Sequence, residues 1–327
     1  MHDRDSLHRF MFEHFPIRGQ LVHLDASWRA LIEHRDYPAG IRDALGQGVA
    51  ASLLLASTIK FEGVLSLQLQ GDGPVRLMLV QCTDGLGVRG LARYRDDGAD
   101  QTEFAALLGS GTLTVTLENE SAAQRYQGIV PIADGSLADA LQLYFENSEQ
   151  LPTRLWLHAD AEGASGMLLQ RLPLESALAP AGAVQAGAAH TGAAHTAAMH
   201  AGAMETGAAH TVDVEDAWRR VQIIGDTLTP EELRTLSDRE ILHRLFNEDD
   251  VRLYEPSPVY FRCRCSRERV AGMLQGLGEQ EIRSLIAERG EVEVRCDFCN
   301  RAYAFDAVDA AQLFNTGVAT DRGSSVH

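Results

Sequence analysis

Residues 64–80, VLSLQLQGDGPVRLMLV, decide the fold class of the large N-terminal part of the chain. Apolar and polar side chains alternate strictly along residues 64–70, as expected for a strand with one buried face. The run Gly-Asp-Gly-Pro at residues 71–74 is typical of a turn, and a second apolar strand follows it. The stretch therefore predicts a β-hairpin.

Helical and strand-like segments alternate on both sides of this hairpin. Apolar residues recur at helical spacing through residues 41–60, and residues 137–147 predict a second amphipathic helix, capped at Ser136. A short helix is expected at residues 7–12. Further strands are expected at residues 112–118, 126–130, 154–158 and 167–172. A sheet packed with helices, of the α+β class, is therefore predicted as one domain over residues 1–180.

Two unusual segments follow this domain. Residues 181–211 consist almost entirely of Ala, Gly, His, Thr and Met in a five-residue repeat. This composition favours a disordered insert over loose metal binding by its histidines, and we assign it no function. Residues 212–255 hold twelve acidic residues against six arginines, and two capping boxes predict short helices there. We interpret this segment as a charged helical linker.

Four of the five cysteines stand in two close pairs after the linker, Cys263 with Cys265 and Cys296 with Cys299. This C-x-C and C-x-x-C spacing is typical of a tetrahedral zinc site with four thiolates and no position open for catalysis. Strand-like residues flank the second pair, as in a zinc knuckle. The sequence therefore predicts one Zn²⁺ bound by these four cysteines in a small domain over residues 256–308, followed by a helix end and tail at residues 309–327.

The other candidate ligands show no such spacing. Cys82 lies in a strand-like segment and is expected to be a buried core residue. His14, His23 and His34 are expected on the surface or at helix caps.

The zinc site could be an inert staple or a redox switch. Six arginines lie close to the cysteines in the sequence, and nearby cations favour the thiolate, which both binds zinc and reacts with oxidants. They are Arg262, Arg264, Arg267, Arg269, Arg295 and Arg301. A domain of about fifty residues has little core, so its folding should depend on the metal. Oxidation to disulfides would expel zinc and unfold this domain together with the linker, which favours a switch.

The composition works against several classes of protein. The chain has 46 acidic and 29 basic residues and a formal charge of −17, which opposes a role in nucleic-acid binding. The first residues lack a signal-peptide pattern, and the longest nearly apolar run, residues 49–59, is too short to span a bilayer. Nucleotide-binding and hydrolase motifs are absent from the sequence. We therefore expect a cytoplasmic protein that is not an enzyme and binds neither membrane nor nucleic acid.

The cysteine motif resembles that of the redox-regulated 33-kilodalton heat-shock protein family of holdase chaperones. The resemblance rests on residues 263–269 and 296–299, and it extends to N-terminal motifs at residues 7–10, 67–74, 125–128, 148–154 and 166–170. It implies an ATP-independent chaperone that is zinc-bound and inactive when reduced. It further implies that oxidation forms the Cys263–Cys265 and Cys296–Cys299 disulfides and unfolds the linker, and that a homodimer then binds unfolding client proteins.

The sequence departs from the family pattern at two positions near the cysteines and leaves two other functions open. Val270 stands where some members have another cysteine, and Asn300 stands where a glycine often follows, but neither change removes a ligand. A thiol-disulfide oxidoreductase would use Cys296 and Cys299, although the expected strand context does not suit it. A zinc-ribbon binding module would need a basic face, yet residues 256–306 hold eight arginines and eight acidic residues.

Overall fold

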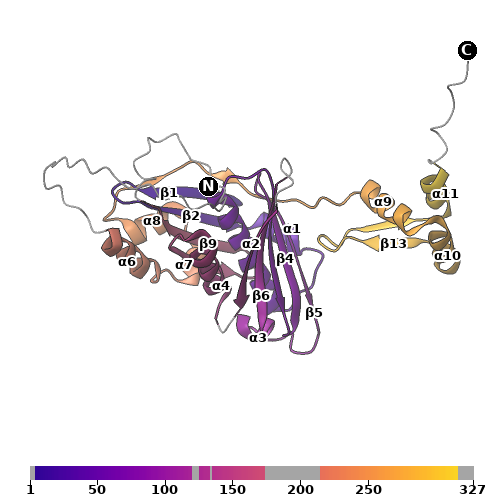
Figure 1. The fold of residues 1–327 in the computed structure, drawn as a ribbon, viewed down its shortest axis with the longest axis horizontal. Coiled ribbons are helices and arrows are strands. Elements are labelled where there is room, and N and C mark those ends of the chain that lie inside the picture. Colours follow the sequence, from indigo (N-terminus) through magenta and orange to yellow (C-terminus); the bar gives the residue numbers. More distant parts are fainter. Residues whose placement is uncertain (1–3, 120–124, 133–134, 174–213, 316–327) are drawn as a thin grey trace, which may run out of the picture. The chain divides into compact units, whose positions relative to one another are not determined.

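The computed structural model describes residues 4–119, 125–132, 135–173 and 214–315 (Figure 1). Within these ranges the chain forms two compact units. The larger unit holds residues up to 30 and from 37 to 261, and the smaller one holds residues 31–36 and those from 262 onward. The insert predicted at residues 181–211 lies outside the described residues. The mixture of sheets and helices confirms the α+β class.

The larger unit contains two sheets, of which the first is antiparallel and has the strand order β10-β1-β2-β9-β8, with β11 also pairing with β1. Its strands are β1 (Ser6–Phe12), β2 (Ile17–Leu24), β8 (Thr153–Ala159), β9 (Ala164–Arg171), β10 (Val251–Leu253) and β11 (Ser257–Pro258). Strands from the beginning, middle and linker of the chain thus share one sheet.

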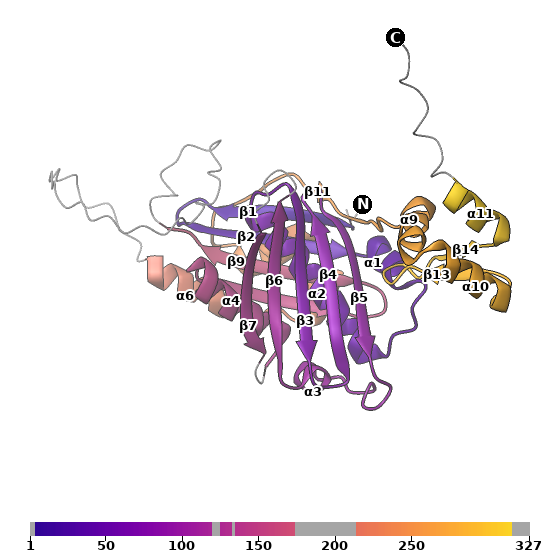
Figure 2. The ribbon, with the colours of Figure 1, turned by 45° about the vertical axis from the view of Figure 1, so that its right-hand side comes forward.

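The second sheet has the order β12-β5-β4-β3-β6-β7, and Figure 2 shows β7 to β5 side by side. Its strands are β3 (Gly63–Gly71), β4 (Val75–Thr83), β5 (Gly87–Tyr94), β6 (Gly111–Asn119), β7 (Arg125–Ile132) and β12 (Tyr260–Phe261). The antiparallel pair β3–β4 confirms the predicted hairpin. The short β12 runs parallel to β5. Residues 256–261, which the sequence assigned to the zinc domain, therefore belong to the larger unit, and from here on we count them as the end of the linker.

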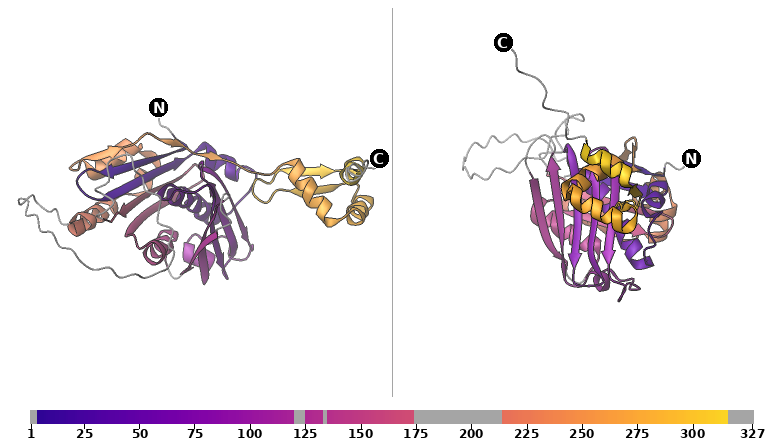
Figure 3. Two further views of the ribbon diagram at one scale, coloured as in Figure 1. Left: turned by 45° about the horizontal axis from the view of Figure 1, so that its top comes forward. Right: turned by 90° about the vertical axis from the view of Figure 1, so that its right-hand side faces the viewer.

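Helix α2 (Ala39–Thr58) contacts strands of both sheets and lies between them (Figure 3, left). It matches the helix predicted at residues 41–60, and its buried residues surround the helix because it is covered on both sides. The other helices among the described residues before the linker are α1 (Ala26–Ile32), α3 (Phe104–Leu108) and α4 (Leu137–Tyr144), which continues as the π-helical turn η1 (Phe145–Glu149). The expected capping box at Ser136 is present at the start of α4. No described helix combines the length and the apolar character that crossing a bilayer requires.

The helix predicted at residues 7–12 is wrong, because these residues form β1. So short a run of mostly apolar residues does not separate a helical period from a strand period. Pairing decides the outcome, since β1 bonds to β2 on one edge and to β10 and β11 on the other. Phe10 and Phe12 then project from the same face, and Gly19 on β2 leaves room for the Phe10 ring, which a Cβ at that position would meet at 2.1 Å.

The linker forms three helices that pack on the first sheet, α6 (Val214–Gly225), α7 (Pro230–Thr235) and α8 (Asp238–Phe246). Both predicted capping boxes, at Thr229 and Ser237, begin α7 and α8. The helices and the sheet share one buried apolar cluster, which we call the linker–sheet cluster. Its members are Phe10, Phe12, Ile17, Leu21, Met167, Leu169, Trp218, Val221, Leu228, Leu233, Ile241, Leu242, Leu245 and Phe246.

Charged groups of the linker are partly neutralised. Arg220 bonds to Asp249 within the linker at 3.0 Å, and Arg154 on β8 reaches Asp226 at 3.1 Å. The Arg154–Asp226 pair is exposed and contributes about 0–1 kcal/mol, whereas the Asp249 carboxylate is largely buried. The linker–sheet cluster therefore supplies most of the free energy that holds the linker on the sheet.

The smaller unit consists of α9 (Arg267–Leu277), α10 (Glu279–Arg289), the antiparallel pair β13 (Val292–Arg295) and β14 (Ala302–Phe305), and α11 (Ala307–Asn315). Both strands match the predicted strands beside the second cysteine pair. Among the described residues, its buried apolar cluster has six members, namely Val270, Leu274, Ile282, Tyr303, Phe305 and Ala310. So small a core stabilises a domain weakly.

The packing of Phe246 yields a prediction about the linker. Its ring lies 5.0 Å from that of Phe12 and is 2% exposed. Phe246→Ala should cost about 3–5 kcal/mol of packing free energy and speed amide hydrogen exchange in residues 238–246 of the reduced protein. Ile223→Ala on α6 is the matched control, because Ile223 is 62% exposed. Equal exchange in the two variants would contradict the packing argument.

Candidate metal centre

The first cysteine pair lies between β12 and α9. Cys263 follows β12 after one residue, and Cys265 directly precedes the N-cap of α9, Ser266, whose hydroxyl accepts a hydrogen bond from the backbone N–H of Arg269. The cap ends the extended segment at the pair and begins the helix there. Both thiols are therefore fixed next to an ordered helix start.

The second pair lies in the tight turn between β13 and β14. The backbone N–H of Asn300 donates to the carbonyl of Cys296 at 2.8 Å, and the N–H of Cys296 donates to the carbonyl of Arg301 at 3.0 Å. Asn300 has φ +54°, a left-handed conformation that Gly and Asn adopt most readily. This backbone explains why asparagine can replace the glycine expected there.

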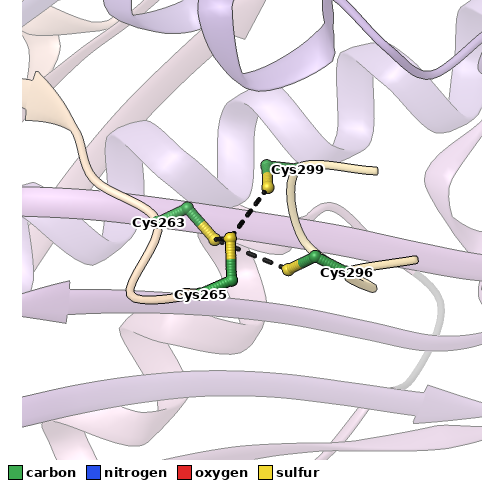
Figure 4. A group of neighbouring side chains, drawn as sticks. All are labelled: Cys263, Cys265, Cys296 and Cys299. Carbon is green, nitrogen blue, oxygen red and sulfur yellow. Dashed lines mark hydrogen bonds between the residues drawn. The ribbon is translucent and has the colours of Figure 1, made fainter. Parts of the chain in front are cut away.

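The four thiols converge on one point (Figure 4). The Sγ–Sγ distances are 3.4 Å between Cys263 and Cys265, 3.6 Å between Cys263 and Cys296, and 3.3 Å between Cys265 and Cys299. All four sulfur atoms lie within 4.8 Å of one another, and none of the described cysteines forms a disulfide.

This geometry suits a metal ion. With Zn–S bonds of about 2.3 Å, a tetrahedral site separates its sulfur atoms by about 3.8 Å. The distances between the thiols are close to that value, so small shifts of the side chains would admit the ion. The four cysteines form a possible metal-binding site, and a set of four thiolates favours zinc among the common metals.

The thiols differ in their acidity. Burial alone would raise the pKa of Cys265, but hydrogen bonds from Tyr303 and from neighbouring thiols outweigh it and lower this pKa to about 7. Burial raises the pKa of Cys263, and it raises that of Cys299 to about 12. The Tyr303 hydroxyl lies 3.2 Å from the Cys265 sulfur and donates to it. Tyr303 thereby connects the thiols to the core of the smaller unit.

The arginines do not act as a group. Arg267 pairs with Asp309 at 2.8 Å and stacks on Phe305, and Arg295 pairs with Glu293 at 2.7 Å. Arg301 interacts electrostatically with Cys265 and Cys299, and its own pKa is raised, first by its hydrogen bond with Tyr303. The expectation that cations favour the thiolates thus stays a prediction, while Tyr303, which sequence analysis missed, is the main group that lowers the pKa of Cys265.

The remaining candidates lie elsewhere. Cys82 is fully buried, as predicted, and burial raises its pKa to about 12. His14 and His34 are exposed, as predicted. The prediction for His23 is wrong, since it is only 7% exposed and lies under the linker helices. Its place two residues after Leu21, on the same face of β2, is the sequence signal that indicates burial.

Comparisons with known proteins point to one family. A family model described as "Hsp33 protein" matches residues 5–306. The chain is 43% identical to the "33 kDa chaperonin" of Nitrosococcus oceani over the full length of both proteins, and 41% identical to that of Methylobacillus flagellatus over 96% of each. It also resembles the crystal structure of the 33 kDa chaperonin of Thermotoga maritima, with a TM-score of 0.71 and 19% identity over 96% of this chain and 99% of that one.

Metal binding can be tested directly. Reduced protein should bind one equivalent of Co²⁺ with the sulfur-to-metal charge-transfer absorption of a four-thiolate site, and Cys299→Ser should lose it. A strong chelator should then unfold α9, α10 and α11 while α2 stays protected from hydrogen exchange, because only the smaller unit lacks a large core. Cys82→Ala is the control and should bind Co²⁺ normally. Unchanged binding in Cys299→Ser would contradict the site.

Tyr303 provides a second test. Tyr303→Phe keeps the buried ring but removes the hydrogen bond to Cys265, and loss of such an outer partner typically weakens metal affinity by about 10-fold or more. Zinc should pass faster to a chromogenic chelator, with an unchanged circular dichroism spectrum. Tyr254→Phe in the linker, where the ring is 42% exposed, should transfer zinc at the normal rate. Equal rates in both variants would show that the hydrogen bond is not important.

Proposed function

The chain belongs to the Hsp33 family, and we propose that it is a chaperone whose binding of unfolding proteins is switched on by oxidation of Cys263, Cys265, Cys296 and Cys299. Membership in the family supports the chaperone role. The redox switch, the zinc ion, the homodimeric active state and the location in the cytoplasm are parts of the proposal. It includes neither an enzymatic activity nor a nucleic-acid or membrane partner.

The linker–sheet cluster is the observation that carries the proposal. Chaperones that hold unfolding proteins need an apolar surface, and such a surface must be covered when they are inactive. Here one face of the first sheet presents Phe10, Phe12 and Leu21 to the linker helices, which bury them almost completely. Release of the linker would expose this face together with the apolar sides of the helices.

The path of the chain supports coupling between thiols and linker. After α8 the linker pairs with β1 through β10 and β11 and with β5 through β12, and only Arg262 separates β12 from Cys263. Unfolding of the cysteine-containing unit would therefore free the C-terminal anchor of the linker. The acidic linker would then be held by the cluster, by ion pairs such as Arg154 with Asp226, and by the contacts of Asp238 with the first sheet.

Oxidation supplies the trigger. Bound Zn²⁺ would tie the two cysteine pairs together and stabilise a unit with six buried core residues. Formation of each disulfide removes two electrons from two thiolates and transfers them to an oxidant such as peroxide or hypochlorite. The family resemblance implies that the disulfides form within each cysteine pair, as Cys263–Cys265 and Cys296–Cys299. The geometry alone leaves the pairing open, since the distance of 3.3 Å between Cys265 and Cys299 is as short as the 3.4 Å between Cys263 and Cys265.

The two alternatives have less support. An oxidoreductase with a C-x-x-C motif places the reactive cysteine at a helix N-terminus, whereas Cys296 follows β13 in a turn between strands. A zinc-ribbon module for nucleic acid would need unpaired basic side chains, yet Arg267 and Arg295 beside the cysteines pair with carboxylates.

The test compares zinc release with chaperone activity. Reduced, zinc-loaded protein should not suppress aggregation of a denatured client protein. Peroxide at elevated temperature, or hypochlorite, should release zinc and switch suppression on over the same time course, because both follow from loss of the four thiolates. Equal suppression before and after oxidation would refute the switch.

Two controls separate the alternatives. Cys82→Ala should be activated normally, since this thiol is buried away from the four others. Sustained reduction of insulin disulfides with a thiol donor would favour the oxidoreductase and count against the proposal.

A further inference from the structure

His23 lies buried between the first sheet and the linker and contacts two linker helices at once. Its Nε2 is 2.7 Å from the carbonyl oxygen of Leu233 on α7. Its Nδ1 is 2.8 Å from Oδ1 of Asp238, the first residue of α8, in an ion-pair contact rather than a linear hydrogen bond. One core side chain therefore joins α7 and α8 to the sheet.

The two contacts fix the protonation of the ring. A backbone carbonyl only accepts, so Nε2 must carry a proton. A carboxylate also only accepts, so an unprotonated Nδ1 at 2.8 Å would place its lone pair against a negative charge. Burial raises the pKa of Asp238, but the contacts with His23 and His8 outweigh this and lower it to about 2, so Asp238 is ionised near neutral pH. With the linker in place, both ring nitrogens of His23 therefore face acceptors, and a proton on each nitrogen would satisfy both contacts.

The other groups around the ring do not supply this charge. His8 on β1 also contacts Asp238 through Nδ1, but it needs one ring proton there, which the neutral ring can carry. The neighbouring residue on β9, Ser165, is uncharged. Beyond it, His158 on β8 lies 3.8 Å from Asp160, and Arg234 on α7 pairs with the same carboxylate at 3.3 Å.

We propose that His23 is a proton-dependent latch, which binds a proton when the linker docks and weakens docking as the pH rises above neutrality. A free imidazole loses this proton above about pH 6.5, whereas the docked ring needs it. Docking then takes up one proton, and its equilibrium constant falls by up to about tenfold for each pH unit above that point.

The carboxylate sets the acid limit of the latch. Because the pKa of Asp238 falls to about 2 in the docked state, its stabilisation is present above the ordinary carboxyl pKa of about 4 and is lost as the pH falls from there towards 2. Docking is therefore tightest between about pH 4 and pH 6.5. The latch deepens the regulation of the proposed chaperone, and only its effect on client binding rests on that proposed function.

The experiment uses reduced, zinc-loaded, full-length protein without oxidant or client. Hydrogen exchange of residues 230–246 is measured between pH 6.5 and pH 7.5 and corrected for the intrinsic exchange rate at each pH. The opening constant of this segment should rise by up to about tenfold, while that of α2 stays constant. In His23→Gln, whose amide does not titrate, the opening constant of the segment should be larger than in the wild type. It should be equal at pH 6.5 and pH 7.5.

Three variants make the result specific. His14→Gln is the matched control, because His14 also contacts a linker carboxylate, Asp250 at 2.9 Å, but its side chain is 66% exposed; this variant should keep the pH dependence. His8→Gln should keep it as well. If His23→Gln does not fold, Asp238→Asn serves instead, since a neutral amide no longer requires the second ring proton.

Two results would overturn the latch, namely a wild-type opening constant that does not change with pH, or a pH dependence that persists in His23→Gln or in Asp238→Asn. If the pH dependence of linker opening were lost in His8→Gln but kept in His23→Gln, the assignment of the latch to His23 would be overturned. A pH-dependent linker in a protein that oxidation does not activate would keep the latch and refute the proposed function. Normal oxidative activation with a pH-independent linker would do the reverse.

Discussion

The structure depends on the burial of one sheet face by the linker. Phe10, Phe12 and Leu21 lie on strands near the beginning of the sequence, yet the residues that cover them come from α6 to α8, about 200 positions later. An uncovered face of this size would be a site of association with any apolar chain. The same contact therefore stabilises the protein and keeps this apolar face of the first sheet out of contact with other chains.

A metal at the cysteine centre would affect the folding free energy of the smaller unit rather than that of the larger unit. The larger unit has a large core, whereas the apolar cluster of the smaller unit has six buried residues, of which Tyr303 donates to Cys265. A bound metal would thus support folding of a unit that is weak alone. Because this unit follows β12 directly, its unfolding in the proposed switch would loosen the end of the linker that pairs with both sheets.

Local signals explain what could be predicted from the sequence. The hairpin, the capping boxes at Ser136, Thr229 and Ser237 and the cysteine spacing depend on residues a few positions apart. The errors arise where distant pairing decides, although the place of His23 two residues after Leu21 is a local sign of its burial. Residues 7–12 become β1 through partners on β2 and the linker, and His23 is buried by Asp238, which lies 215 positions along the chain. No local pattern encodes such a partner.

The charge of the linker has a physical role in this arrangement. Its twelve acidic residues repel one another, and exposed pairs such as Arg154 with Asp226 recover little of that free energy. Apolar packing and the contacts of Asp238 with His23 and His8 must therefore outweigh the repulsion for the helices to stay docked. Once the anchor at β12 is lost, the same repulsion favours a hydrated, extended segment over a return to the sheet. A composition that stabilises a free helix poorly is thus suited to a removable cover.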